Sequence, residues 1–151
     1  MNATPADPGP AVYPVGLRLK DRRVVVVGGG QVAHRRVAGL LEAGAQVTVV
    51  SPDVTPALEA LVAPGSLTWI PRRYETGDLD GAWYAVAATD DHAVNAAVGE
   101  EADRNRIFCA RADDRRASSV WTPAEGNRSD SAPTAADIRP RRTSLRTAQA
   151  E

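Results

Sequence analysis

Uninterrupted apolar runs alternate along this chain with segments in which apolar residues recur every three or four positions. Runs of the first kind, the first of them four consecutive valines, are typical of strands buried on both faces of a parallel sheet. Segments of the second kind are typical of helices with one buried face. The pattern predicts an α/β fold with strands at 23–27, 46–50, 67–70, 83–87 and 107–110 and helices at 31–43, 56–62 and 92–105.

Five strands that alternate with helices make a doubly wound parallel sheet, a Rossmann-like fold, for which we expect the strand order 3-2-1-4-5. Ligands bind such sheets at the carboxyl ends of the strands, where the strand order reverses. Gly44 is expected to end the first helix in a left-handed conformation, and Thr55 is expected to cap the second.

A glycine-rich turn joins the first strand to the first helix and matches the pattern Gly-x-Gly-x-x-Gly/Ala. Gly28 allows a sharp turn off the strand, Gly30 lets a pyrophosphate approach the backbone, and Ala33 allows close packing of the helix on the sheet. The unpaired amides at the helix start can then bind phosphate. An ordinary glycine-rich turn is the alternative, but strand, spacing and helix together favour a dinucleotide site.

Residues that follow the other strands are expected to converge on the same crevice. Ser51 ends the second strand, and the nearby Asp53 either binds a ribose or caps the next helix. The small residues Ala88 and Thr89, followed by Asp90, leave room for a nucleotide after the fourth strand. Asp113 follows the fifth strand and completes this set.

Composition excludes several classes of function. The formal charge of −1 gives no overall field that would recruit nucleic acid or an acidic membrane, and no apolar run is long enough to span a membrane. Cys109 is the only cysteine, so we expect a soluble protein of the reducing cytoplasm, with Cys109 as a small core residue. Because His34 and His92 are the only histidines, no tight metal site is expected, although a metal can still be a substrate.

The two ends of the chain differ from its centre. Residues 1–12 are rich in proline and lack apolar periodicity, so they are expected to be disordered. Residues 124–151 include only Ile138 and Leu145 as large aliphatic residues and are also expected to be a disordered tail. A single nucleotide-binding domain is therefore expected at 13–123.

Several motifs in this domain resemble the precorrin-2 dehydrogenase family, the NAD-dependent module of siroheme synthase. The resemblance covers about residues 13–123 and is most specific in Gly-Gly-Gly-Gln-Val-Ala-His-Arg at 28–35 and Ala-Thr-Asp-Asp-His-Ala-Val-Asn at 88–95. It implies oxidation of precorrin-2 to sirohydrochlorin with NAD⁺, and in some members insertion of Fe²⁺ to give siroheme.

The resemblance also implies roles for single residues. Gln31 and Val32 are expected to line the pyrophosphate, and Pro52 and Asp53 to lie against the adenosine ribose. The family's catalytic aspartate follows the fifth strand in an Asn-Val-Val-Asp context, which here reads Ala-Arg-Ala-Asp at 110–113. This register makes Asp113 the expected general base, with Asp114 as the nearest substitute.

The substrate implied by the resemblance carries many carboxylates, for which arginine is the natural partner. Trp121 is expected to anchor the last segment rather than to pack against a macrocycle. The family forms homodimers, but its dimerisation region is not visible at 127–151, so a non-catalytic or degenerate NAD(H)-binding module is the alternative function. Candidate carboxylate clamps are Arg72, Arg73, Arg111, Arg115 and Arg116.

Overall fold

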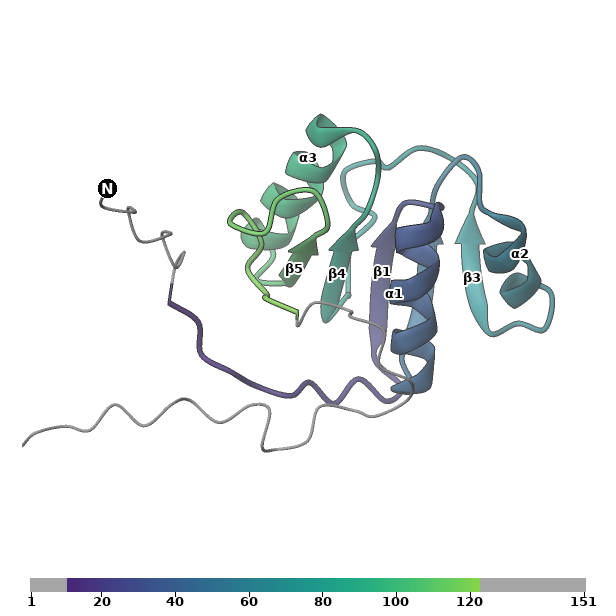
Figure 1. Cartoon of the computed structure of the whole chain (residues 1–151), viewed down its shortest axis with the longest axis horizontal. Coiled ribbons are helices and arrows are strands. Elements are labelled where there is room, and N and C mark those ends of the chain that lie inside the picture. The colour runs from purple at the N-terminus through teal and green to yellow at the C-terminus, as the bar shows by residue number, and fades with distance from the viewer. Residues whose placement is uncertain (1–10, 123–151) are drawn as a thin grey trace, which may run out of the picture.

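The computed structural model describes residues 11–122 of the chain, which form five strands and three helices in strict alternation except between β3 and β4 (Figure 1). Residues 1–10 and 123–151 lie outside the described residues, and with them most of the lead-in predicted at 1–12 and all of the tail predicted at 124–151. The elements are β1 (Arg23–Val27), α1 (Gln31–Glu42), β2 (Gln46–Val50), α2 (Pro56–Val62), β3 (Leu67–Ile70), β4 (Tyr84–Ala87), α3 (His92–Arg104) and β5 (Phe108–Arg111).

All strand pairs are parallel, and the sheet has the order β3-β2-β1-β4-β5 that the sequence predicts. Two strands differ in their bounds from the prediction, and α1 and α3 each end one residue earlier than predicted. Trp83 lies outside β4; the residue is 60% exposed, and the Arg22 guanidinium lies over its ring at 3.8 Å. β5 begins and ends one residue later than predicted, so Arg111 belongs to the strand and pairs with Ala87.

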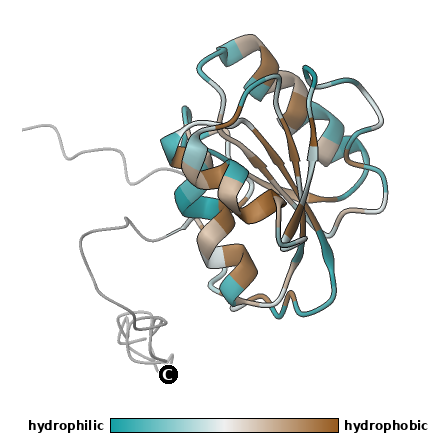
Figure 2. Ribbon diagram, turned by 90° about the vertical axis from the view of Figure 1, so that its right-hand side faces the viewer, coloured by the Kyte–Doolittle hydropathy of each residue, from teal (hydrophilic) through white to brown (hydrophobic). Residues whose placement is uncertain are grey.

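The sheet is covered on both faces, which explains its valine-rich strands (Figure 2). On one face, Val24 and Val26 of β1 pack in a core cluster with Val37 of α1 and Leu58 of α2. On the other face, the alternate side chains of the same strand join a second cluster that includes Val98 and Ala102 of α3. Cys109 is buried in this second cluster, as predicted, and burial raises the pKa of its thiol to about 11.

Local signals at the element ends are also confirmed. Gly44 has φ +80° directly after the end of α1, a conformation that side chains other than glycine rarely adopt. Thr55 caps α2, since its side chain accepts a hydrogen bond from the Leu58 amide. Before β1, Leu19 packs into the first core cluster whereas Tyr13 is 89% exposed.

Within the described residues, no helix is long and apolar enough to cross a membrane.

Candidate functional site

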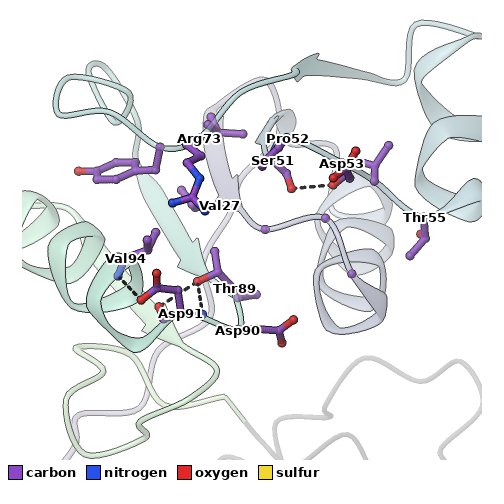
Figure 3. Close-up of a pocket in the computed structure, with 17 residues that line it drawn as sticks. Val27, Ser51, Pro52, Asp53, Thr55, Arg73, Thr89, Asp90, Asp91 and Val94 are labelled. Carbon is purple, nitrogen blue, oxygen red and sulfur yellow. Dashed lines mark hydrogen bonds between the residues drawn. The ribbon is translucent and has the colours of Figure 1, made fainter.

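A crevice of about 560 Å³ opens at the carboxyl ends of β1, β2 and β4. Figure 3 shows Ser51, Pro52 and Asp53 along one side of it, and Thr89, Asp90 and Asp91 along the opposite side. The glycine turn after β1 lies between them, as expected for the point where strand order reverses. The lining residues are 27–30, 50–55, Arg73, Tyr74, 88–91 and Val94.

The three positions of the turn differ in what a side chain in place of glycine would meet. Gly28 has φ +130°, and a Cβ there would collide with the Ala88 carbonyl. A Cβ on Gly29 would collide with the Asp53 carbonyl oxygen and lie 2.7 Å from Ser51 Oγ. A Cβ on Gly30 would meet nothing within 4 Å. Gly28 and Gly29 are therefore required by the protein's own packing, whereas Gly30 faces open space that a ligand can approach.

The start of α1 provides unpaired hydrogen-bond donors. Gly30 is the N-cap and has no side chain to accept from the first turn, and the first intrahelical bond runs from His34 N to the Gly30 carbonyl at 3.0 Å. The amides of the first helical residues therefore lack an intrahelical acceptor. Ala33 is fully buried against the sheet. Gln31 and Val32 are exposed and lie next to the crevice rather than among its lining residues.

The segment after β2 forms one wall of the crevice. Ser51 Oγ donates to the Asp53 carbonyl at 2.6 Å, and Trp69 Nε1 donates to the Ser51 carbonyl at 2.8 Å. Because Thr55 caps α2, the interpretation of Asp53 as a helix cap is wrong. The exposed Asp53 side chain lies at the crevice, and ribose binding by it stays a prediction.

The segment after β4 forms the opposite wall and is held by Asn95, whose side chain is fully buried. Asn95 Oδ1 accepts from the Thr89 amide at 3.1 Å and from Thr89 Oγ1 at 2.7 Å, and Asn95 Nδ2 donates to the Thr89 carbonyl at 2.9 Å. Asp91 caps α3 by accepting from the Ala93 and Val94 amides. Small side chains and a fixed backbone thus keep this wall open.

Asp113 lies beside the crevice and is not among its lining residues. Its Oδ2 lies 2.5 Å from His92 Nδ1 and 3.0 Å from an Arg111 guanidinium nitrogen, and its side chain is only 12% exposed. Burial raises the pKa of the Asp113 carboxyl, but hydrogen bonds from Arg111, His92 and Asn95 outweigh burial and hold this pKa at about 2. Asp113 is therefore an ionised carboxylate that contacts His92, and His92 directly follows the crevice residue Asp91.

The other sequence candidates separate into different environments. The Arg72 guanidinium makes two hydrogen bonds to the Asp78 carboxylate at 2.8 and 2.7 Å, so it is already paired. Arg73 lines the crevice. Asp114 Oδ1 accepts from two backbone amides of its own turn. Among the residues from 11 to 122, no group of three His, Cys, Asp or Glu side chains can hold a metal ion.

Trp121 differs from the prediction. Its side chain is 49% exposed, and the Arg115 guanidinium lies over its ring at 4.7 Å. Val120, one residue earlier, packs against the first core cluster and anchors the segment instead. The indole therefore remains at the surface.

A doubly wound parallel sheet with an open glycine turn at its carboxyl edge defines the class of dinucleotide-binding domains. The chain belongs to the family described as "Putative NAD(P)-binding", whose model matches residues 15–124.

Relatives of known name support the resemblance found in the motifs. Siroheme synthase 3 of Aeromonas hydrophila is 44% identical over 116 residues, which are 77% of this chain and 25% of that protein. Siroheme synthase of Chromobacterium violaceum is 44% identical over 117 residues, 78% of this chain and 25% of that protein. The solved structure of SirC, precorrin-2 dehydrogenase, has a TM-score of 0.67 and 35% identity, and the match covers 75% of this chain and 55% of that one. The chain thus spans about a quarter of the length of the siroheme synthases it matches.

Proposed function

We propose that this domain binds NAD⁺ in the crevice and catalyses the oxidation of precorrin-2 to sirohydrochlorin. The observation that carries the proposal is an open glycine turn at the same edge of the sheet as the loop with the ionised Asp113 carboxylate, in a chain similar to SirC, precorrin-2 dehydrogenase. The names of the related siroheme synthases agree with it.

The crevice has the features that a dinucleotide needs. Gly30 leaves space next to the unpaired amides of the first turn of α1, where a pyrophosphate would accept hydrogen bonds from the backbone of Gln31 and Val32. Ser51, Pro52 and Asp53 would hold the adenosine ribose, and Ala88, Thr89 and Asp90 would face the other half of the cofactor. A carboxylate at the ribose favours NAD⁺, because it would repel the 2′-phosphate of NADP⁺.

The reaction removes two hydrogens from the substrate, one as a hydride and one as a proton. Bound NAD⁺ supplies the hydride acceptor. Asp113 is the group that accepts the proton in this proposal, because it stands at the position of the catalytic aspartate in the family resemblance and its carboxylate is ionised at neutral pH. Arg111 and His92 fix the orientation of the carboxylate through their hydrogen bonds.

Three further features belong to this proposal. Fe²⁺ is a second substrate, since a carboxylate that accepts a proton in oxidation can also accept pyrrole protons when a metal enters the macrocycle. The domain works as a homodimer, as the family resemblance implies. The reaction takes place in the cytoplasm, where the buried Cys109 stays reduced.

A non-catalytic NAD(H)-binding module is the alternative, and one experiment separates the two. The purified chain is incubated anaerobically with precorrin-2 and NAD⁺, without metal, and NAD⁺ binding is measured in the same sample. The proposal predicts the spectrum of sirohydrochlorin and its loss in Asp113→Ala. NAD⁺ binding without turnover would favour the alternative, and equal turnover of Asp113→Ala would reject the catalytic role of Asp113.

A further inference from the structure

A second pocket, of about 300 Å³, lies on the α1 side of the sheet next to the end of β5. We define the arginine pocket by its lining residues, which come from the first two turns of α1, from 110–112 and from the segment 115–122. Among these described lining residues there is no carboxylate, and the arginines include Arg35 and Arg115, both of which are exposed. The lining therefore offers two exposed guanidinium groups to a ligand.

Two neighbouring features make this more than a charged surface. Trp121 lines the pocket with its exposed ring, over which the Arg115 guanidinium lies at 4.7 Å. Arg36 donates to Thr122 Oγ1 at 2.8 Å and so ties α1 to the segment that carries the indole. An aromatic face with cationic groups around it is suited to a flat ring system that carries carboxylates.

The arginine pocket and the candidate catalytic residue Asp113 are adjacent in the chain. Ala112 lines the pocket, and the next residue, Asp113, points to the other side, where it pairs with Arg111 and His92. The Ala112 amide donates to the Ala87 carbonyl at 2.9 Å, which fixes this segment against the end of β4. The pocket and the candidate catalytic residue thus share one fixed segment after β5.

The volume of the pocket limits what it can hold. At about 300 Å³ it lies at the lower end of small-molecule pockets and is too small for a whole tetrapyrrole. The volume of the pocket suits one edge of the macrocycle, that is, one pyrrole ring with its carboxylate side chains. Arg35 and Arg115 are both exposed and lie where they can reach such carboxylates.

On these grounds we propose that the arginine pocket binds carboxylate side chains of the tetrapyrrole substrate, with Arg35 and Arg115 as clamps and Trp121 as a stacking surface. This inference rests on the proposed function for the identity of the substrate. The binding itself is testable without turnover. It also separates the substrate contacts from the nucleotide crevice, which Arg35 and Arg115 do not line.

The test measures equilibrium binding of uroporphyrin, a stable macrocycle whose side chains all end in carboxylates, to the full chain. The double variant R35Q/R115Q is compared with R104Q/R106Q, which removes the same charge from two exposed arginines at the end of α3 and in the turn that leads to β5. We expect a dissociation constant roughly tenfold or more higher for R35Q/R115Q, and little change for the control. R35K/R115K, which keeps the charge but not the bidentate geometry, should lie between them.

Two outcomes of the binding test would overturn the inference. One is uroporphyrin binding by R35Q/R115Q that matches the control. The other is an equal loss of affinity for inorganic pyrophosphate, which would show a general anion site. In turnover, the inference predicts a higher KM for precorrin-2 with unchanged kcat and KM for NAD⁺. If R35Q/R115Q turns over with an unchanged KM for precorrin-2, the role of the arginine pocket is rejected and the proposed function stands. If the parent chain binds uroporphyrin but does not oxidise precorrin-2, the proposed function is rejected and the arginine pocket stands.

Discussion

His92 Nδ1 lies 2.5 Å from Asp113 Oδ2, and this contact joins the first residue of α3 to the loop after β5. The two side chains have opposite exposure, 80% for His92 and 12% for Asp113. The imidazole therefore connects a largely buried carboxylate to solvent. Under the proposed function, a proton accepted by Asp113 would leave the site through this ring.

Replacing His92 tests this route. His92→Ala should lower kcat about tenfold to a hundredfold, at the low end of the contribution of acid–base groups, with an unchanged KM for NAD⁺. Added imidazole should restore part of the rate, because a free ring can take the vacated space. His92→Gln can still donate to Asp113 but cannot carry a proton, so it should remain slow. A rate in His92→Ala equal to that of the parent would leave His92 with no part in proton transfer.

Asp113 should be needed for turnover and not for cofactor binding. Asp113→Asn keeps the shape of the side chain but removes the charge, so kcat should fall by about a hundredfold or more. NAD⁺ affinity, measured by titration calorimetry, should change little, since Asp113 does not line the crevice. Asp114→Asn is the matched control, because its Oδ1 can still accept from the amides of Arg116 and Ala117. An equal loss of kcat in Asp113→Asn and Asp114→Asn would contradict a catalytic role specific to Asp113.

The glycine turn predicts opposite effects for two adjacent substitutions. Gly29→Ala places a methyl group against the Asp53 carbonyl, so the free energy of unfolding should drop by about 1–3 kcal/mol. Gly30→Ala meets no atom within 4 Å and should cost less than about 1 kcal/mol, mostly from the helix N-cap. NAD⁺ binding should nevertheless weaken in Gly30→Ala, because the methyl group enters the space offered to the pyrophosphate. Urea unfolding and NAD⁺ titration of both variants measure these effects.

The low pKa of Asp113 predicts a pH dependence of stability. Its pKa is about 2 in the folded chain and about 3.9 when unfolded, so the unfolded chain binds more protons between these values. The stabilisation is fully present above the unfolded value and is lost as the pH falls toward 2. Asp113→Asn should therefore show a flatter decrease in the free energy of unfolding between pH 5 and 2 than the parent. Parallel curves for the two proteins would contradict the ion pairing of Asp113.

Much of the fold could be predicted because its signals are local. The valine run of β1 indicates a strand covered on both faces, and Gly28 and Gly44 occupy positive-φ positions that the turn and the helix end require. The boundary of β4 could not be predicted, because Trp83 is apolar in sequence but lies exposed beneath the Arg22 guanidinium.

The parts of the site that the sequence did not predict depend on contacts between distant residues. The need for Gly29 arises from the carbonyl of Asp53, which is brought close only by the pairing of β1 with β2. The contact of His92 with Asp113 likewise joins two segments that the sheet places side by side.

Only the part of the arginine pocket that lies on α1 could be predicted from the sequence. Val32, Arg35 and Arg36 follow one another at helical spacing on α1, a signal that could have placed them on one face. The segment that carries Arg115 and Trp121 completes the pocket, and no periodicity predicts how an irregular segment packs.

The measurement that tests the central claim most directly is the stoichiometry of the anaerobic reaction of the parent chain with precorrin-2 and NAD⁺. NADH and sirohydrochlorin are recorded together by absorbance during the reaction. The account predicts that they form in a one-to-one ratio and that both stop when either substrate is omitted. Sirohydrochlorin formation that is independent of NAD⁺, or NAD⁺ binding with formation of neither product, would contradict the account.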